Sequence, residues 1–293
     1  VHSFVEPYAT LFAFISKRPN EKRFMTIHGT YATYPNHASS ITKPMLVWLF
    51  ARAVKNIDAV IAVSNATREA FEHDMRLMNL PLPKMEVIHV GVILGSSQRE
   101  DVPEVPFTIL SVGGVKPRKG ILEIIRGLGE FKKKFTDQFE YRIVGAAEGT
   151  DSYMQNLKRA IQEEGLTRQV SFLGKIEGDL LQGEYARAHV LALLPRLSGK
   201  DREGFGIVYL EANAYDVPTL GALGTVSEEA IVGGKSGLLV DADNPTAVAD
   251  GFNTIYKKGI PTGGPRAWAE DHAWSRIVSE YERLYLGNLS KES

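Results

Sequence analysis

Phe107-Thr-Ile-Leu-Ser-Val-Gly-Gly-Val-Lys-Pro-Arg-Lys-Gly120 joins a short apolar run to a long periodic segment through a glycine-rich, basic turn. After the turn, apolar residues recur at three- and four-residue spacing, which is typical of an amphipathic helix. They are Ile121, Leu122, Ile124, Ile125, Leu128, Phe131 and Phe135. We expect Lys132–Lys134 mostly on the solvent side of this helix. A buried strand followed by such a helix predicts a βαβ unit.

The same alternation of β-rich runs and helical patterns continues in both directions along the chain. It is typical of parallel sheets covered by helices on both faces, and it predicts the α/β class. Six runs from residue 107 onward are predicted strands, and three precede it, or four if Val1–Ser3 adds one. The predicted strands are Arg23–His28, Ala59–Ser64, Met85–Val90, Phe107–Val112, Glu140–Val144, Gln169–Leu173, Val190–Leu194, Val217–Leu220 and Gly237–Val240.

The chain has 293 residues, which favours two domains at roughly 100–200 residues each. Ser96–Pro106 is charged and contains two prolines, so we interpret it as the linker. An open sheet of three or four strands would leave an edge and apolar faces uncovered. Because the chain also begins with Val1 rather than methionine, we expect the first domain to lack upstream sequence.

Composition excludes several classes of protein. Lysine and arginine total 34 against 35 acidic residues, and the isoelectric point is near 6.7, so no nucleic-acid partner is expected. The chain has no cysteine, which excludes disulfides, thiol nucleophiles and cysteine-ligated zinc. The most lipid-like stretches, Tyr8–Ile15 and Met45–Ala51, are far shorter than the roughly 20 residues of a membrane-spanning helix. We therefore expect a soluble protein.

Glu203-Gly204-Phe205-Gly206-Ile207-Val208-Tyr209-Leu210-Glu211 places two carboxylates eight residues apart around a turn that opens a helix. Free amides from Phe205 to Val208 would favour an anion, because helix N-termini present unpaired N–H groups. Glu211 could accept both hydrogens of a ribose diol, and Glu203 could bind hydroxyls of a second sugar. The alternative is a loop residue and a solvated helix face, although Glu211 lies in an apolar run where an unsatisfied carboxylate is costly.

This motif resembles the Glu-x7-Glu motif of retaining glycosyltransferases of family 4, which have the two-domain GT-B fold. The resemblance covers nearly the whole chain. It includes the strand and phosphate loop at 107–120, the segment 169–196, Ser64-Asn-Ala-Thr67, Val87-Ile-His-Val-Gly-Val92, Gly237-Leu-Leu-Val240, and a C-terminal helix at Trp274–Tyr285 similar to the one that crosses back onto the first domain. It implies two Rossmann-like doubly wound domains: an incomplete acceptor-side domain at 1–100 with helix 272–288, and a donor domain at 101–271.

The resemblance also implies roles for individual residues. Lys119 matches the lysine that neutralises the donor diphosphate, and Gly113 and Arg118 lie in the same loop as donor contacts. The family has an arginine after the first glycine of this loop, where this chain has Gly114, so Arg118 or Lys116 would have to replace it. His28 resembles the active-site histidine that faces the donor sugar, although alone it would be an ordinary strand-end residue. Phe205, Gly206, Ile207, Val208 and Glu211 complete the expected donor site.

Two further stretches bear on metals and on the donor sugar. Asp241-Ala-Asp243 superficially matches a metal-binding Asp-x-Asp, but it precedes Asn244-Pro245, so we interpret it as a turn and a helix cap. The resemblance implies no metal and no cofactor, with a nucleoside diphosphate sugar as donor substrate. Gly224–Glu229 departs from the family's Gly-Gly pair before a glutamate, which leaves the sugar contacts of that loop open. His89 receives no catalytic role.

The resulting hypothesis is a retaining, metal-independent hexosyltransferase that moves a sugar from a nucleoside diphosphate to a hydroxyl of a glycan, lipid or small molecule. One alternative is a non-catalytic nucleotide-sugar-binding fragment, and another is a glycogen-synthase-like glucosyl polymerase. The Glu203–Glu211 spacing argues against an epimerase. We expect a cytoplasmic protein, peripheral to a membrane if the acceptor is a lipid, although Met45–Val54 with Arg52 and Lys55 could equally be a core-facing helix.

Overall fold

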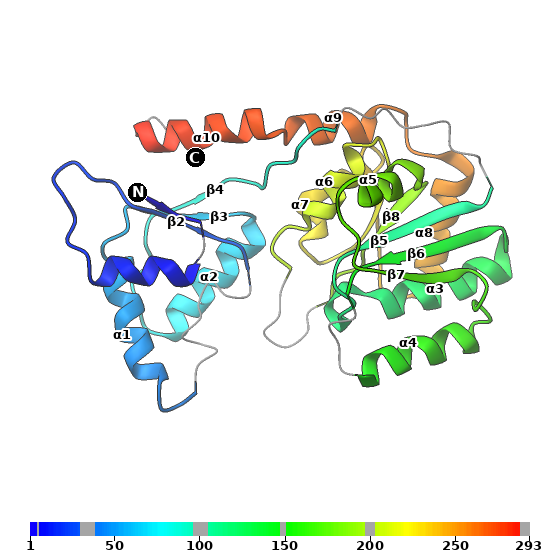
Figure 1. Ribbon diagram of the computed structural model, residues 1–293, viewed down its shortest axis with the longest axis horizontal. Coiled ribbons are helices and arrows are strands. Elements are labelled where there is room, and N and C mark those ends of the chain that lie inside the picture. The colour runs from blue at the N-terminus through cyan, green and yellow to red at the C-terminus, as the bar shows by residue number, and fades with distance from the viewer. Residues whose placement is uncertain (5, 30–38, 96–104, 147–150, 197–202, 288–293) are drawn as a thin grey trace. The chain divides into compact units, whose positions relative to one another are not determined.

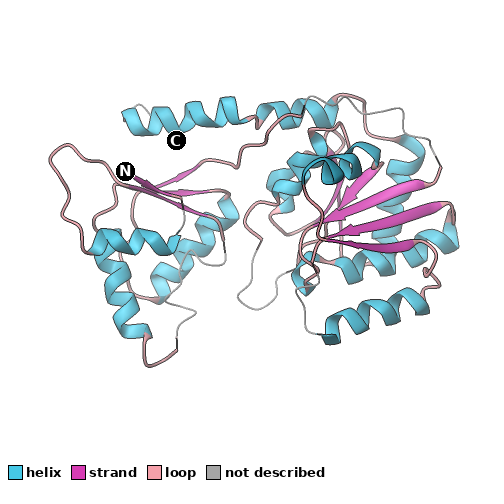
Figure 2. Cartoon of the chain, viewed as in Figure 1, coloured by secondary structure: helices cyan, strands magenta, loops and turns pink. Residues whose placement is uncertain are grey.

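The computed structural model describes residues 1–4, 6–29, 39–95, 105–146, 151–196 and 203–287 (Figure 1). Most of the expected linker, Ser96–Pro106, therefore lies outside the described residues. The chain forms two compact units. Unit 1 is Val1–Val90, Lys200–Phe205 and Trp274–Ser293, and unit 2 is Gly91–Gly199 and Gly206–Ala273. Each unit contains one parallel sheet with helices (Figure 2), which is the α/β class expected from the sequence.

Unit 1 is built on a four-stranded sheet in the order β1-β2-β3-β4. The strands are β1 (His2–Ser3), β2 (Phe24–Ile27), β3 (Ala59–Ala62) and β4 (Met85–Val87). The three predicted strands of this half are each found within three residues of their predicted ends, and the optional strand at Val1–Ser3 is present as β1. Every pair is parallel.

Alternate residues of β2 and β3 face opposite layers of unit 1, as the two-residue period of a strand requires. Met25, Ile27, Val60 and Ala62 pack against one set of helices: η1 (Glu6–Ala13), α1 (Lys43–Val54) and α2 (Asn65–Leu77). Phe24, Ala59 and Ile61 instead share a cluster with Ile277, Tyr281 and Leu284 of α10 (Trp274–Leu286). Helix α1 buries Phe50, Ala53 and Val54 in the core, while Met45 and Trp48 are exposed.

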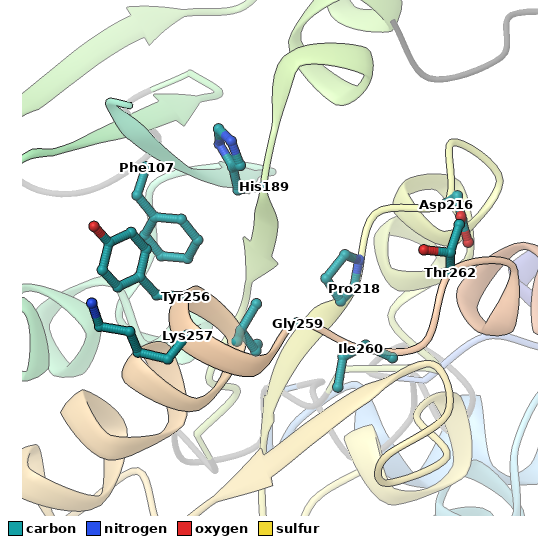
Figure 3. Close-up of a pocket in the computed structure, with 10 residues that line it drawn as sticks. Phe107, His189, Asp216, Pro218, Tyr256, Lys257, Gly259, Ile260 and Thr262 are labelled. Carbon is teal, nitrogen blue, oxygen red and sulfur yellow. The ribbon is translucent and has the colours of Figure 1, made fainter. Parts of the chain in front are cut away.

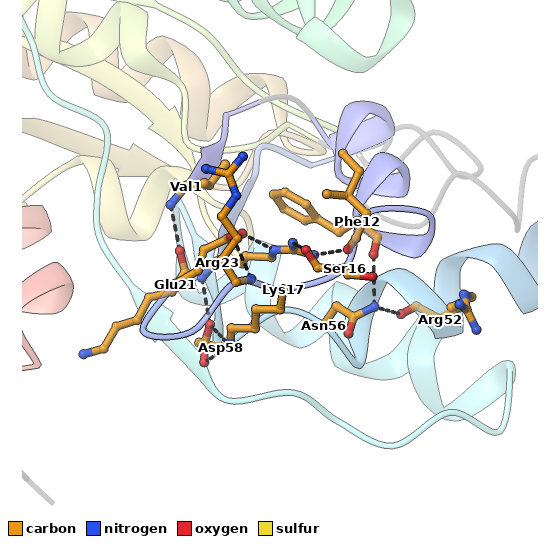
Figure 4. A network of polar contacts seen from close by, with 12 residues as sticks. Val1, Phe12, Ser16, Lys17, Glu21, Arg23, Arg52, Asn56 and Asp58 are labelled. Atoms are coloured by element: carbon orange, nitrogen blue, oxygen red, sulfur yellow. Dashed lines mark hydrogen bonds and ion pairs between the residues drawn. The ribbon is translucent and has the colours of Figure 1, made fainter.

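A buried arginine fastens the segment that follows η1 to the sheet of unit 1 (Figure 4). The side chain of Arg23 is 1% exposed, and its guanidinium donates to the carbonyls of Ile15 at 2.8 Å and Ser16 at 2.9 Å. Its Nε donates to Glu21, whose carboxyl pKa this hydrogen bond lowers. Because a buried guanidinium is costly unless its donors are satisfied, these bonds define the path of the chain into β2.

Unit 2 is built on a six-stranded parallel sheet in the order β10-β9-β8-β5-β6-β7. Its strands are β5 (Phe107–Val112), β6 (Phe139–Val144), β7 (Val170–Gly174), β8 (Val190–Ala192), β9 (Thr219–Ala222) and β10 (Gly237–Val240). All six were predicted from the sequence, with ends that differ by no more than two residues. The prediction for unit 2 is therefore confirmed strand by strand.

Helices cover both faces of this sheet (Figure 1). On one face, α3 (Ile121–Lys134), α4 (Asp151–Glu163) and α8 (Pro245–Lys258) share one core with the strands. The periodic residues Ile124, Ile125, Leu128 and Phe131 are fully buried there, whereas Phe135 ends the helix and is 38% exposed. The other helices are α5 (Gly178–Arg187), α6 (Ile207–Asn213), α7 (Ser227–Ala230) and α9 (Gly264–Asp271). The 3-10 turn η3 (Pro117–Lys119) precedes α3.

Candidate functional site

The strand order of unit 2 contains one reversal, between β5 and β8. From β5 the chain runs outward through β6 to β7, and it then returns to place β8 on the other side of β5. In open α/β sheets, ligands bind outside the carboxyl ends of the strands at such a reversal. The loops that follow β5 and β8 are therefore the place where topology alone predicts a ligand site.

These two loops are in direct contact. Gly120 adopts φ +70°, and a Cβ atom at this position would lie 1.8 Å from the carbonyl oxygen of Leu194. Nearby, the amide of Arg196 donates to the carbonyl of Arg118 at 2.9 Å. A side chain at 120 would collide with backbone, so glycine is required for this approach. The basic turn after β5 is thus held against the segment after β8.

Lys119 lies inside this contact region. Its side chain is 8% exposed, and its Cε and Nζ atoms lie 3.4 Å and 3.5 Å from where a Cβ of Gly113 would be. The lysine therefore folds back over the glycine that follows β5. The structure thus brings together the three predicted residues of this loop, Gly113, Arg118 and Lys119, at the carboxyl end of β5.

Helix α6 begins at Ile207, next to the end of β8. Gly206 is its N-cap with φ +84°, and the hydroxyl of Tyr209 donates to the carbonyl of Leu193 at 2.6 Å and lies 2.8 Å from Ser227 Oγ. The start of the helix is fixed to the segment after β8 by these bonds. The amides of Ile207 and Val208 belong to its first turn, where N–H groups have no partner within the helix.

Glu211 is held by a tyrosine from another helix. The hydroxyl of Tyr185, on α5, donates to Glu211 Oε2 at 2.6 Å. Tyr185 is 3% exposed, and its ring stacks on Tyr215 with centroids 5.7 Å apart. Burial raises the pKa of the Tyr185 phenol well above 10, and the negative charge of Glu211 raises it further. The phenol therefore stays protonated and orients the carboxylate.

Glu203 and His28 both belong to unit 1. The segment Lys200–Phe205 groups with this unit, and a Cβ atom at Gly204 would lie 2.1 Å from the carbonyl oxygen of His28. Glu203 is half-buried, whereas His28 is exposed, and its Nε2 lies 3.0 Å from the carbonyl oxygen of Phe4. The structure therefore brings the residue after Glu203 to the backbone of His28, although the two are far apart in sequence.

The motif Glu203–Glu211 is divided between the two units. Residues up to Phe205 belong to unit 1, and residues from Gly206 belong to unit 2. Phe205, expected to offer an amide in the same turn as Ile207, precedes the helix; it is 2% exposed and its ring packs on His89 with centroids 5.1 Å apart. The two carboxylates are thus carried by different units.

Two stretches considered for metal or sugar binding have local partners. Asp241 Oδ1 accepts from the amide of Asp243 at 3.0 Å, and Asn244 caps α8 by accepting from Thr246 and Ala247. The interpretation as a turn and a helix cap is confirmed. In the loop after β9, Glu228 Oε1 accepts from the amide of Gly224 at 2.7 Å, so this carboxylate shapes its own loop.

A pocket of about 480 Å³ lies at the opposite ends of the strands of unit 2 (Figure 3). Phe107 begins β5, and His189 and Pro218 precede β8 and β9, so the pocket faces the amino ends of these strands. The amide of Thr108 donates to His189 Nδ1 at 2.9 Å. Lys119 follows the carboxyl end of β5, the end of the strands at which α/β sheets place ligands. This pocket is therefore separate from the site at Lys119.

The sequence did not reveal the partners that position the candidate residues. Tyr185 is 26 residues before Glu211 and lies on another helix, and no spacing rule links them. Ser64 and Thr67 bind the carbonyl of Gly204 from positions 140 and 137 residues away.

Among the described helices, none combines the length and apolar character that crossing a bilayer requires.

Comparisons with known proteins agree with this architecture. Residues 96–270 match the family "Glycosyl transferases group 1", and residues 1–95 match "Glycosyltransferase Family 4". Among solved structures, HepE of Anabaena in complex with UDP and glucose is 20% identical, has a TM-score of 0.77, and is covered over 77% of its length by 98% of this chain. A glycosyltransferase from Rickettsia africae has a TM-score of 0.68 at 19% identity, with 98% of this chain and 82% of that one covered.

Curated relatives are similar over part of their length. A GDP-mannose-dependent alpha-(1-6)-phosphatidylinositol monomannoside mannosyltransferase of Mycolicibacterium smegmatis is 32% identical over 170 residues, which are 56% of this chain and 43% of the relative. A D-inositol 3-phosphate glycosyltransferase of Geodermatophilus obscurus is 27% identical over 193 residues, which are 64% of this chain and 42% of the relative. Both matches span less than half of the relative's length. With its two parallel sheets of GT-B type, the chain belongs to the group 1 glycosyl transferases of glycosyltransferase family 4.

Proposed function

We propose that this chain is a retaining, metal-independent glycosyltransferase that moves a hexose-type sugar from a nucleoside diphosphate sugar to a hydroxyl acceptor. Membership of the family supports the reaction class. The observation that carries the proposal is the buried residue Lys119, whose side chain folds over Gly113, where the loops after β5 and β8 meet. A cation at this reversal of strand order suits an anionic ligand such as a diphosphate.

Unit 2 is the donor-binding part in this proposal, corresponding to a domain at 101–271. Lys119 and Arg118 bind the diphosphate together with the amides of Gly206, Ile207 and Val208. The positive end of a helix favours the same charge. As the bond to the sugar breaks, negative charge grows on the departing diphosphate, and fixed donors that already point at it lower the barrier.

Glu211 binds the ribose of the donor in this proposal. Its Oε2 already accepts a hydrogen bond from Tyr185, so the plane of the carboxylate is set before the nucleotide arrives. Oε1 then accepts from a ribose hydroxyl. A carboxylate acceptor makes a charge-assisted hydrogen bond, which is stronger than one between neutral groups.

Unit 1 contributes the contacts to the transferred sugar, with the acceptor-side domain at 1–100 and the helix 272–288. Glu203 accepts from sugar hydroxyls, and His28 contacts the same sugar. The close approach of Gly204 to the carbonyl of His28 supports a shared role, since it joins the backbones that carry these two side chains. In transfer, such contacts orient the anomeric carbon for attack by the acceptor hydroxyl.

The names of similar proteins guide the choice of substrates. One relative is named for GDP-mannose and a phosphatidylinositol mannoside, and another for an inositol phosphate, while HepE was solved with UDP and glucose. We propose a hexose donor on GDP or UDP and an acceptor with several hydroxyl groups, such as an inositol phosphate or an inositol lipid. A lipid acceptor would bring the protein to a membrane surface.

The test is a panel of GDP- and UDP-hexoses, measured first by thermal unfolding and then by transfer to inositol phosphate and inositol-lipid acceptors. A ligand at 100 times its dissociation constant adds about 2.7 kcal/mol to the free energy of unfolding. We expect stabilisation by one nucleotide class and transfer of its sugar with retained anomeric configuration. Stabilisation without turnover by any acceptor would instead support a non-catalytic binding protein, and long products would support a polymerase.

A further inference from the structure

The segment Ser64-Asn-Ala-Thr67 does more than begin helix α2. Ser64 is the N-cap residue, with extended backbone angles, and its Oγ accepts from the amide of Thr67 at 2.9 Å. This bond accounts for the oxygen of Ser64 as an acceptor. It leaves the hydroxyl protons of Ser64 and Thr67 without a role in capping, although these side chains are only 0% and 3% exposed.

Both hydroxyls are directed at one carbonyl group. Ser64 Oγ lies 2.7 Å from the carbonyl oxygen of Gly204, and Thr67 Oγ1 lies 3.0 Å from it. The two hydroxyl oxygens are 2.9 Å apart. The three oxygens thus share two protons, and a carbonyl can only accept. Every arrangement that uses both protons within this group donates at least one of them to Gly204.

The segment around Gly204 is also held from its other sides. A Cβ at Gly204 would meet the carbonyl of His28 at 2.1 Å, so glycine is needed for this approach. The ring of Phe205, which is 2% exposed, packs on His89. The peptide that follows Glu203 is therefore fixed by hydrogen bonds, by backbone contact and by a buried ring, all within unit 1.

We propose that Ser64 and Thr67 are positioning residues for Glu203. Their hydroxyls hold the Gly204 carbonyl and so fix the backbone from which the Glu203 side chain reaches the transferred sugar. This inference rests on the proposed function for the role of Glu203, and it adds the residues that place it. A helix cap alone would need the oxygen of Ser64 and the amide of Thr67, but not the hydroxyl of Thr67.

The test separates the two roles with matched variants. Thr67→Val removes the hydroxyl and keeps the shape and the amide, whereas Thr67→Ser keeps the hydroxyl. Ser64→Ala removes both the cap and the donor, whereas Ser64→Thr keeps both. Because either hydroxyl alone can still bind Gly204, we expect each removal to lower kcat by about 3- to 10-fold and the pair to lower it by about 100-fold, the scale of misplacing a reacting group by 1 Å.

The KM of the donor should change by less than about 3-fold in the paired variant, because donor binding rests on unit 2 and only the orientation of the sugar is lost. Adding the paired change to Glu203→Gln should cause little loss of kcat beyond that of Glu203→Gln alone, since both changes act through one carboxylate. A fully additive loss would overturn the proposal. So would a Thr67→Ser variant as slow as Thr67→Val.

Hydrogen exchange of the wild-type and variant proteins tests the hydrogen bonds from Ser64 and Thr67 to the Gly204 carbonyl without relying on turnover. We expect the amide of Phe205, in the peptide unit that includes the Gly204 carbonyl, to exchange faster in Thr67→Val, a variant that retains the helix cap. Unchanged exchange in both Thr67→Val and the paired variant would show that these hydroxyls do not hold the Gly204 carbonyl, and it would overturn the proposal. A wild-type protein that transfers no sugar would refute the proposed function instead, while its exchange data would still decide whether Ser64 and Thr67 hold Gly204.

Discussion

The hydroxyl of Tyr185 donates a 2.6 Å hydrogen bond to Oε2 of Glu211, joining helix α5 to helix α6. This bond helps to explain how a half-buried carboxylate is tolerated within the apolar run from Ile207 to Ala214, because an acceptor removed from water is stable when a donor meets it. It also removes rotational freedom from the carboxylate before any ligand binds. Tyr185 is thus a structural partner of Glu211, and under the proposed function it also contributes to nucleotide affinity.

Replacing Tyr185 by Phe should lower both stability and nucleotide affinity. The carboxylate of Glu211 loses a donor, and hydrogen bonds to charged groups contribute about 1.5–3 kcal/mol. We expect the free energy of unfolding in urea to fall by about that amount and the Kd for the preferred nucleoside diphosphate, measured by calorimetry, to rise about 5-fold or more. Tyr215→Phe retains the stacked ring and serves as the control. Equal affinities in the Tyr185→Phe and wild-type proteins would contradict the role of this bond.

Lys119→Ala and Glu203→Gln should each lower kcat by about 10²–10³-fold, the scale for removing one contact that stabilises charge or position in the transition state. Lys119→Ala should also abolish most of the stabilisation by nucleoside diphosphates, whereas Glu203→Gln should retain it. Lys257→Ala is the matched control, since its amine lies over the ring of Tyr256 beside the pocket at the amino ends of the strands. Undiminished turnover in both site variants would refute the assignment.

A pair of glycines separates backbone strain from steric collision. Gly120 and Gly224 have nearly the same φ, +70° and +69°, but a Cβ at 120 meets backbone at 1.8 Å and a Cβ at 224 meets nothing within 4 Å. Gly224→Ala should therefore cost about 1–2 kcal/mol for the left-handed conformation alone. Gly120→Ala should cost more than about 4 kcal/mol and weaken nucleotide binding. Equal losses in urea unfolding would show that the two loops do not meet as described.

His2 should make unit 1 less stable in mild acid. Its ring nitrogens lie 2.6 Å from the hydroxyl of Tyr285 and 2.8 Å from Thr26 Oγ1. Burial lowers its pKa from 6.5 to about 4, with further lowering by the amino terminus and by His28. The unfolded chain therefore binds more protons, so the stability contributed by neutral His2 is complete above pH 6.5 and declines as the pH falls toward 4.

Unfolding of the wild-type protein at pH 7.0, 6.0 and 5.0 measures this effect, in a range where most carboxylates stay ionised. We expect the free energy of unfolding to fall with pH by about 1 kcal/mol, since solvent screens a ring that is only partly buried. His2→Gln should remove most of the slope. An equally steep slope in His2→Gln would assign the effect to other groups.

Much of the fold was predictable because local pattern and tertiary structure agree. The central strands β5, β8 and β9 of unit 2 are buried almost throughout, as expected for a parallel sheet covered on both faces, and the periodic residues of α3 are in the core. Phe135 shows where prediction from the apolar pattern fails. It continues the apolar period, but the helix ends before it and leaves it exposed. The period alone does not reveal where a helix stops.

The candidate site was predictable only in part. Glycines and a lysine after a strand indicate an anion site, because that chemistry depends on neighbouring residues. The bonds from Tyr185 to Glu211 and from Ser64 and Thr67 to Gly204 depend on which elements fold side by side. Serine and threonine at a helix start are explained by capping alone, so their second role shows no signature in the sequence.

The contact between Gly120 and Leu194 has a consequence for anyone who wishes to redesign this protein. The obstacle to a methyl group at 120 is a main-chain oxygen, which every amino acid at 194 would also carry. No compensating replacement at 194 can therefore open room, and a saturation library spanning both positions should return glycine at 120 while 194 varies. New donor preferences would have to be selected elsewhere in the loops.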